Sequence, residues 1–175
     1  SLDKSMSQLT NYLSEIDKVN QIVAKAHESG VDGILLVDLP PEESEQFNQV
    51  LSQYNMNQIF LLAPTSTDER IQHVIKQASG FIYYVSLKGV TGAATLDTSE
   101  AAKRIEKIKA QTNIPVGVGF GINDAQSAKA MAAVADAVIV GSALVKPFAT
   151  LPPEQAAEQT VNKVKELRAA LDELV

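Results

Sequence analysis

Short apolar runs alternate with longer amphipathic stretches along most of the chain. The apolar runs are almost continuous in hydrophobicity, which is typical of parallel strands buried on both faces. We predict five such strands, at Gly33–Asp38, Gln58–Leu62, Phe81–Val85, Pro115–Phe120 and Asp136–Val140. Apolar residues at helical spacing predict five helices, at Glu42–Tyr54, at Thr67–Ala78, around Ala101, Ile105 and Ile108, at Asp124–Val134 and at Glu154–Val175. Thr67 is the predicted N-cap of the second helix, and Asn123 is that of the fourth. This alternation predicts an α/β fold of right-handed βαβ units with a parallel sheet.

The first thirty residues follow a different pattern. From Lys4 to Ser29 there is no Gly or Pro, and apolar residues recur at helical spacing, at Met6, Leu9, Leu13 and Ile16. One long helix is therefore predicted, with Gly30 as its stop. We expect this helix to cover the sheet. The alternatives are a seam for self-association, or two shorter helices divided near Asn11, Ser14 and Asn20.

Composition narrows the classes of partner and site. With 175 residues, of which 45% are hydrophobic, we expect a single domain over residues 1–175. A net charge of -6 argues against nucleic acid and anionic lipid as partners. There is no cysteine for a disulfide, a thiolate nucleophile or a zinc site, and His27 and His73 have no third ligand nearby, so no metal site is expected. No long apolar run or signal sequence is evident, so we expect a cytoplasmic protein without membrane contact.

Three glycine-containing turns follow predicted strands. They are SLKGVTGA at Ser86–Ala93, Gly121-Ile122-Asn123, and Gly141-Ser142-Ala143. Glycine lets a ligand approach the backbone closely, and consecutive N–H groups near a helix N-terminus can bind an anion. One such turn is weak support, because turns need glycine for backbone reasons alone. Three turns at successive strand ends predict a shared phosphate site, which Lys88 and Lys146 could help to neutralise.

Five stretches in a fixed order resemble the tryptophan synthase alpha subunit family. They are GVDGILLVDLPPEES, APTSTDERI, GFIYYVSLKGVTGA, PVGVGFGI and DAVIVGSALVK. The resemblance covers roughly Val23 to Lys146, continues weakly into the last helix, and corresponds to strands four to eight of the family. It implies a partial (β/α)8 TIM-type barrel with about five strands and an N-terminal helix. Residues 1–22 do not resemble the family, residues 23–146 form the alpha-subunit-like βα units, and residues 147–175 carry the C-terminal helix.

The resemblance also implies an activity and roles for residues. The family cleaves indole-3-glycerol phosphate to indole and glyceraldehyde 3-phosphate in tryptophan biosynthesis, and passes indole to a beta subunit that contains pyridoxal phosphate. The alpha subunit itself needs no cofactor. By matching motifs, the phosphate would be held by Gly92, Gly121, Gly141 and Ser142. The substrate pocket would contain Tyr83 and Thr91, with the indole side contacted by Leu61, Phe120 and Ile139.

Two carboxylates that this chemistry requires are absent. The family pairs a glutamate in an E-L-G-x-P-F-S-D-P run with an aspartate in A-D-G-P, and neither run occurs here. Each acid or base contributes about 10²–10⁴ to the rate, so we expect phosphate binding without cleavage. Asp38, at a predicted strand end near the Pro40-Pro41 turn and the beta-subunit contact, is a weak catalytic candidate, since a structural hydrogen-bonding role is favoured.

Several alternatives stay open at this point. The chain could be a truncated or engineered scaffold without activity, a lyase that uses Asp38, or another phosphate-binding barrel such as a thiamine-phosphate synthase relative. Five strands cannot close an eight-stranded barrel, so the open sheet edges need covering, and a homo-oligomer formed through them is one solution. Tyr83 and Tyr84 point to opposite faces of their strand; the motif selects Tyr83 for the ligand side, and core packing is its alternative role.

Overall fold

The computed structural model describes residues 2–85, 98–119 and 121–174, with the backbone alone described for residues 2–14, 98 and 99. Five strands make up the sheet: β1 (Gly33–Leu35), β2 (Asn57–Leu62), β3 (Ile82–Val85), β4 (Val116–Gly119) and β5 (Ala137–Ile139). The helices are α1 (Leu2–Glu28), η1 (Pro41–Glu43, a 3-10 turn), α2 (Glu45–Gln53), α3 (Asp68–Gln77), α4 (Thr98–Lys109), α5 (Ala125–Ala132), α6 (Ser142–Thr150) and α7 (Pro153–Asp172).

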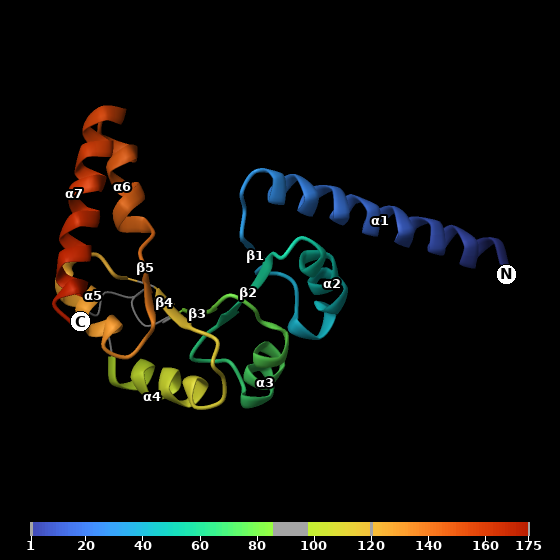
Figure 1. The fold of residues 1–175 in the computed structure, drawn as a ribbon, viewed down its shortest axis with the longest axis horizontal. Coiled ribbons are helices and arrows are strands. Elements are labelled where there is room, and N and C mark those ends of the chain that lie inside the picture. Colours follow the sequence, from blue (N-terminus) through green and yellow to red (C-terminus); the bar gives the residue numbers. More distant parts are fainter. Residues whose placement is uncertain (1, 86–97, 120, 175) are drawn as a thin grey trace.

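All five strands are parallel and lie in sequence order, β1-β2-β3-β4-β5 (Figure 1). The predicted α/β fold with a parallel sheet is therefore confirmed. Among the described residues, β1 pairs only with β2 and β5 only with β4, so each outer strand presents one unpaired edge. Helices α3 and α4 lie along one side of the sheet (Figure 1).

The main hydrophobic core lies between the sheet and these helices. Alternate strand residues face it and are almost fully buried, among them Leu62, Ile82, Tyr84, Val116 and Val118. The predicted apolar face of the fourth helix is confirmed, because its three residues all pack into this core, namely Ala101, Ile105 and Ile108. The buried side chains of the strands and the apolar face of α4 thus form one apolar layer.

The N-terminal helix is continuous, as the sequence pattern predicts, and it is not divided near Asn20, whose side-chain amide donates to the Ile16 carbonyl at 3.1 Å. The expectation that it covers the sheet is wrong. Its C-terminal turns pack beside α2 and reach only the β1 edge, in a second apolar cluster around Val23, Val50 and Leu51. The rest of the helix extends away from the body (Figure 1). Apolar periodicity specified the helix but not the surface that it covers.

Side-chain hydrogen bonds define several element boundaries. Thr67 caps α3 as predicted, accepting from the Arg70 amide at 3.2 Å. The cap of α5 is Asp124 and not Asn123; its carboxylate accepts from the Ser127 amide at 2.7 Å, and this bond, with the Ser127 hydroxyl, lowers the pKa of Asp124. The helix predicted from Glu42 to Tyr54 is divided into η1 and α2 at buried Ser44, whose hydroxyl donates to the Pro41 carbonyl at 2.8 Å.

The last predicted helix is present, but its apolar stripe is only partly buried. Leu167 is 6% exposed, whereas Val161 and Val164 are 51% and 46% exposed. Helix α7 packs against α5 and α6, which receive one part of the stripe and leave the other part uncovered. None of the helices in the described ranges is long and apolar enough to span a membrane.

An ion pair ties the end of α4 to the start of two strands. Lys109 Nζ lies 2.7 Å from Asp136 Oδ1, and Asp136 Oδ2 accepts from the Val116 amide at 2.8 Å. Partial burial raises the pKa of the Asp136 carboxyl, but the Lys109 ammonium and the Val116 amide outweigh it and hold this pKa below its ordinary value. The charged form of Asp136 is thus favoured in the folded state.

Asp136→Asn should make the protein less sensitive to acid. The folded-state pKa lies below that of the unfolded chain, so the carboxylate stabilises the fold above the unfolded value of about 3.9, and this contribution is lost as the pH falls through the lowered folded value. The variant should lose up to about 1 kcal/mol at pH 7, because both side chains of the pair are more than one third exposed and solvent screens them. Urea unfolding from pH 7 to pH 2 measures this. Equal loss of stability in both proteins below pH 4 would contradict it.

Candidate active site

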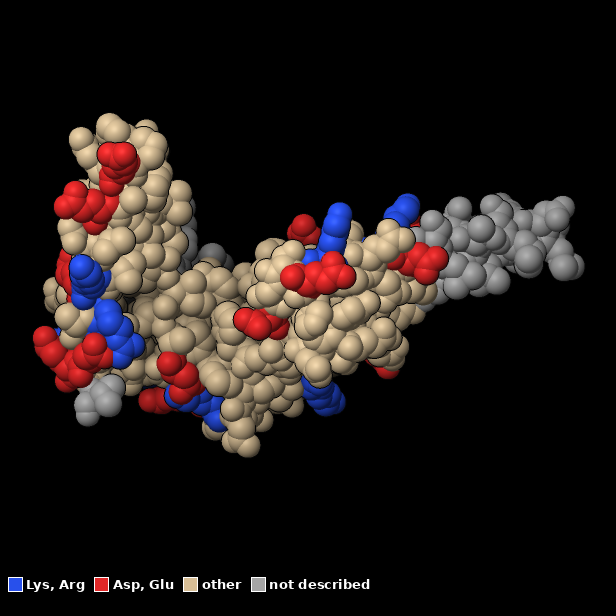
Figure 2. All heavy atoms as spheres, turned by 45° about the horizontal axis from the view of Figure 1, so that its top comes forward, with Lys and Arg blue, Asp and Glu red and all other residues tan. Residues whose placement is uncertain are grey.

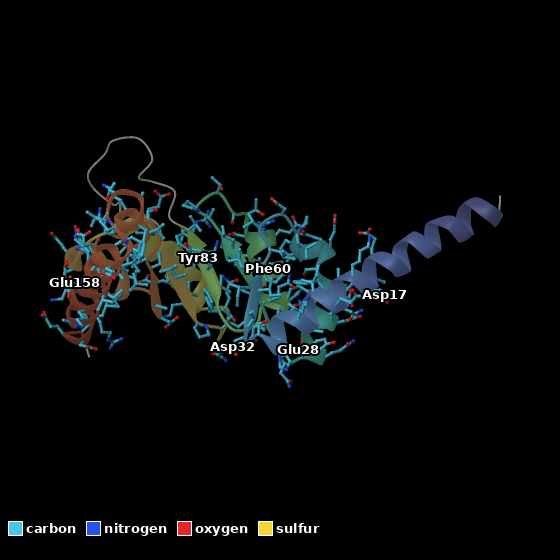
Figure 3. All side chains as sticks on the ribbon, turned by 90° about the horizontal axis from the view of Figure 1, so that it is seen from above. Asp17, Glu28, Asp32, Phe60, Tyr83 and Glu158 are labelled. Carbon is cyan, nitrogen blue, oxygen red and sulfur yellow. The ribbon has the colours of Figure 1, made fainter. Side chains whose placement is uncertain are left out.

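The face of the sheet opposite the helices carries three of the predicted pocket residues, Leu61, Tyr83 and Ile139. The two tyrosines of β3 point to opposite faces, as predicted: Tyr84 is 1% exposed in the core, whereas Tyr83 is half-buried on the other side. Tyr83 lies near the middle of the molecule in Figure 3. Leu61 pairs in register with Tyr83, and Tyr83 pairs with Gly117. Because paired residues of parallel strands share a face, Leu61 and Tyr83 are neighbours on this inner face. Their contact with a ligand stays a prediction.

Two glycines of β4 make room for the Tyr83 ring. A Cβ atom built on Gly119 would lie 2.6 Å from the Tyr83 hydroxyl oxygen and 3.1 Å from Ile139 Cβ, so the ring lies across this position. A Cβ atom on Gly117 would lie 3.1 Å from Ile139 Cδ1 and 3.4 Å from the Phe81 ring. The structure thus brings Tyr83 and Ile139 together over Gly119.

Gly117, Gly119 and Phe81 are inner-face residues that the sequence pattern did not single out. A usable signal was present, because Gly117 and Gly119 are two residues apart and so lie on one face of a strand. Glycine inside a strand marks a place where another group approaches the backbone closely. Here that group is the Tyr83 side chain.

The turns after β4 and β5 lie side by side at the carboxyl ends of these two strands. Gly119 and Ile139 pair in register, and two residues further along each strand come Gly121 and Gly141. Gly121 has a φ of +69°, in the left-handed region that favours glycine. Gly141 is the N-cap of α6, and its carbonyl accepts from the Leu144 amide at 2.9 Å. Three of the four residues predicted to bind phosphate, Gly121, Gly141 and Ser142, therefore lie together at the carboxyl ends of β4 and β5.

Gly121, Gly141 and Ser142 are all exposed at these strand ends, and their binding of an anion stays a prediction. The first N–H groups of a helix have no partner within it, and α6 begins at exposed Ser142. A Cβ atom built on Gly121 or Gly141 would meet no atom of the described residues within 4 Å, so no described side chain fills the space in front of either glycine. Gly92, Thr91, Phe120 and Lys88, which the sequence also assigns to this site, lie outside the described residues.

The remaining polar candidates lie at the surface. The first strand ends at Leu35 and not at Asp38, so Asp38 is an exposed residue in the following turn. His73 is not free in solvent: its Nδ1 lies 2.8 Å from Glu42 Oε1 and joins α3 to η1. The pKa of Glu42 is lowered, mainly by a backbone hydrogen bond at Glu42 and to a smaller extent by the hydrogen bond with His73. Within the described ranges, no three His, Asp or Glu side chains come close enough together to hold a metal ion.

Comparison with known proteins decides the family. A sequence model described as tryptophan synthase alpha chain matches residues 8–175. The chain belongs to this family. The match includes residues 8–22, for which the sequence pattern gave no resemblance, and it decides between the barrel families left open above.

Curated relatives and solved structures agree with this assignment. The tryptophan synthase alpha chain of Acinetobacter baumannii is 73% identical over 169 residues, which cover 95% of this chain and 63% of the relative. That of Paraburkholderia phymatum is 51% identical over 174 residues, covering 98% of this chain and 64% of the relative. The chain therefore spans less than two thirds of the length of these relatives.

Structures of the family superpose closely on this fold. A tryptophan synthase subunit alpha from Legionella pneumophila has a TM-score of 0.75 at 34% identity, covering 92% of this chain and 60% of the other. The alpha chain in a structure of the tryptophan synthase α2β2 complex from Pyrococcus furiosus has a TM-score of 0.77 at 36% identity, covering 86% and 61%. The predicted fold, a partial barrel of parallel βα units, is thereby confirmed.

Proposed function

We propose that this chain forms the phosphate-binding part of a tryptophan synthase alpha-type site and holds indole-3-glycerol phosphate there. The observation that carries the proposal is the pair of neighbouring turns at Gly121 and Gly141, with the N-terminus of α6 directly behind the second turn. Backbone N–H groups in this arrangement attract a dianion although the chain as a whole carries a charge of -6.

The inner face of the sheet suits the indole ring of this substrate. Leu61, Tyr83 and Ile139 offer apolar and aromatic surface beside the turns, which fits a planar indole ring. In Figure 2, the surface between the α6–α7 pair and the β1 end of the molecule shows few charged side chains. Phosphate at the turns and indole over the sheet would therefore orient the substrate without an ionic contact to its ring.

Gly141→Val should weaken phosphate binding strongly and leave the fold almost unchanged. The new side chain would extend in front of the turn, where the anion is proposed to bind, and its Cβ meets no atom of the described residues within 4 Å. Losing this position should lower the affinity for glycerol 3-phosphate at least tenfold, about 1.4 kcal/mol. Calorimetric titration measures the affinity. Ala149→Val, in the exposed last turn of α6, is the matched control and should bind normally.

Binding is not expected to lead to cleavage by this chain alone. Breaking the carbon–carbon bond needs a proton delivered to the indole ring and another removed from a glycerol hydroxyl. The two family carboxylate motifs are absent from the sequence, and Asp38 is exposed beyond the end of β1. Incubation with indole-3-glycerol phosphate should therefore release no indole above the uncatalysed rate. Turnover that disappears in Asp38→Asn would instead establish the alternative, a lyase that uses Asp38.

A tryptophan synthase beta chain is the macromolecular partner that we propose. The relative from Pyrococcus furiosus is described as part of an α2β2 complex, and the sequence resemblance assigns the beta contact to the loop around Asp38, Pro40 and Pro41. In this chain that loop is held by η1, in which Pro41 is buried and Glu42 contacts His73. Sedimentation of this chain with an Acinetobacter beta chain would detect the complex.

A further inference from the structure

The two histidines of the chain each join neighbouring helical elements, but by different contacts. His27, in the last turn of α1, packs its ring against that of Tyr54 at the end of α2, with the ring centroids 5.6 Å apart. His73, on α3, contacts a carboxylate of η1, with 2.8 Å between its Nδ1 and Glu42 Oε1. Protonation of His73 therefore places opposite charges against each other across two elements.

The carboxylate that His73 holds belongs to a turn whose backbone is already fixed. The Ser44 hydroxyl donates to the Pro41 carbonyl at 2.8 Å, and the Glu43 amide donates to the Pro40 carbonyl at 3.0 Å. Pro41 is buried. These bonds hold residues 40–44 as one unit, so a contact that fixes one side chain of the turn positions the whole turn against α3.

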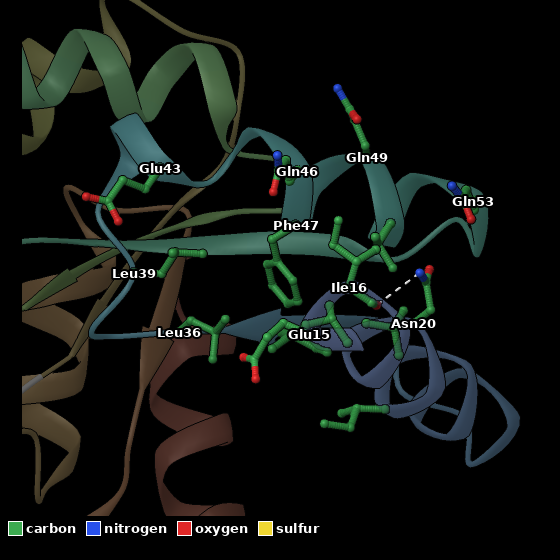
Figure 4. A pocket seen from close by; sticks show the side chains of 15 residues that line it. Glu15, Ile16, Asn20, Leu36, Leu39, Glu43, Gln46, Phe47, Gln49 and Gln53 are labelled. Atoms are coloured by element: carbon green, nitrogen blue, oxygen red, sulfur yellow. Dashed lines mark hydrogen bonds between the residues drawn. The ribbon is translucent and has the colours of Figure 1, made fainter. Parts of the chain in front are cut away.

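The neighbouring charges leave the pair of His73 and Glu42 intact. The charged side chains of the elements packed here are Glu42 and Glu43 of η1, Glu45 of α2, and Asp68, Glu69, Arg70 and Lys76 of α3. Glu43 lines a groove between α1, β1 and α2, together with Leu39 and Phe47 (Figure 4). Asp68 is paired with Lys107 at 2.6 Å. Neither of these carboxylates therefore replaces Glu42 beside His73.

Glu42 keeps its charge while a histidine titrates. A backbone hydrogen bond at Glu42 comes first among the causes that hold its pKa below the ordinary value, followed by the hydrogen bond from His73, and the charges of His73 and Arg70 act in the same direction. A histidine side chain takes up its proton between about pH 5 and 8, where a carboxylate with a lowered pKa is fully ionised. The proton on the imidazole therefore decides whether this contact is an ion pair.

The sign of the pH dependence follows from this titration. The ion pair forms as the pH falls through the histidine range, and it is lost as the pH rises through that range. The neutral ring can still share a hydrogen bond with the carboxylate, so the contact weakens without disappearing. Because the two side chains are 38% and 48% exposed, solvent screens the pair, and its effect on an equilibrium is about two- to fivefold.

We propose that His73 is a positioning residue for the turn that meets the beta chain, and that protonation of His73 strengthens this contact. This role rests on the beta chain proposed above as the partner, and it adds the residue and the proton that regulate the binding. The protonated ring holds the Glu42 carboxylate, and with it Pro40 and Pro41, in place before the partner arrives. A turn that is ordered in advance loses less conformational freedom on binding, which favours the complex.

The test measures the affinity of the intact chain for an Acinetobacter beta chain at pH 6 and pH 8 by analytical ultracentrifugation. The unchanged chain should bind about two- to fivefold more tightly at pH 6. His73→Gln should remove this difference, because glutamine forms hydrogen bonds but takes up no proton. His73→Lys should bind at pH 8 as tightly as the unchanged chain does at pH 6, because lysine is charged at both values. His27→Gln is the matched control and should keep the difference.

A double-mutant cycle on the chain alone measures the pair directly. In urea unfolding, the coupling between His73→Gln and Glu42→Gln should change the unfolding equilibrium about two- to fivefold at pH 6 and should be close to absent at pH 8. Circular dichroism should show these variants folded, because both replaced side chains are partly exposed. A coupling of equal size at both pH values would overturn the inference, since the contact would then not depend on the proton.

Two results with the beta chain would also overturn the role of His73. The first is equal affinity of the unchanged chain at pH 6 and pH 8. The second is a pH difference that persists in His73→Gln or disappears in His27→Gln. In both cases a complex is still formed, so the proposed partner stands. The absence of a complex at either pH would instead refute the beta chain as partner, and with it the role of His73.

Discussion

Leu62→Ala should lower the free energy of unfolding by about 2–5 kcal/mol. Leu62 is the last residue of β2, is fully buried, and lies in the main core with Ile71, Val74 and Ile82. Removing its three outer carbons leaves a cavity that the sheet on one side and α3 on the other can fill only in part. Urea-induced unfolding followed by circular dichroism measures the change.

Leu174→Ala is the matched control for this substitution. Leu174 has the same side chain but is 50% exposed near the C-terminus, so the change should stay within about 0.5 kcal/mol. A loss below 1 kcal/mol for Leu62→Ala would mean that β2 and α3 do not pack together as described.

Gly119→Val should destabilise the protein by about 1–3 kcal/mol and displace Tyr83 from the inner face. The smallest side-chain atom at this position already falls 2.6 Å from the Tyr83 hydroxyl oxygen and 2.8 Å from its ring, distances that non-bonded atoms do not adopt. The isoleucine on the other side, Ile139, leaves little room for the valine to turn away. Substrate-analogue binding should fall with stability, because the aromatic surface of the inner face is lost.

A double-mutant cycle separates this clash from other effects. In Gly119→Val with Tyr83→Ala, the valine finds the space that the ring has left, so the two changes together should cost less than the sum of the single changes. The coupling should be about 0.5–3 kcal/mol. Simple additivity in urea unfolding would show that the Tyr83 ring does not lie across Gly119.

The sequence by itself determined the elements and their direction. Nearly continuous apolar runs and helical stripes follow from the burial of individual side chains, and Ala101, Ile105 and Ile108 accordingly lie in the core that their spacing predicts. The ordered motifs also indicated the family, because they record backbone requirements such as the left-handed Gly121. The positions of Gly121, Gly141 and Ser142 at strand ends were readable for the same reason.

Only the tertiary structure decided which surfaces these elements cover. The sequence could not show that β1 ends at Leu35, that the α1 helix reaches only the β1 edge, or that Tyr83 lies across Gly119. Each of these depends on residues that are far apart along the chain and meet only when the strands pair. Local hydrophobicity predicts that a side chain is buried, but the packing of the whole sheet and its helices determines which neighbours bury it.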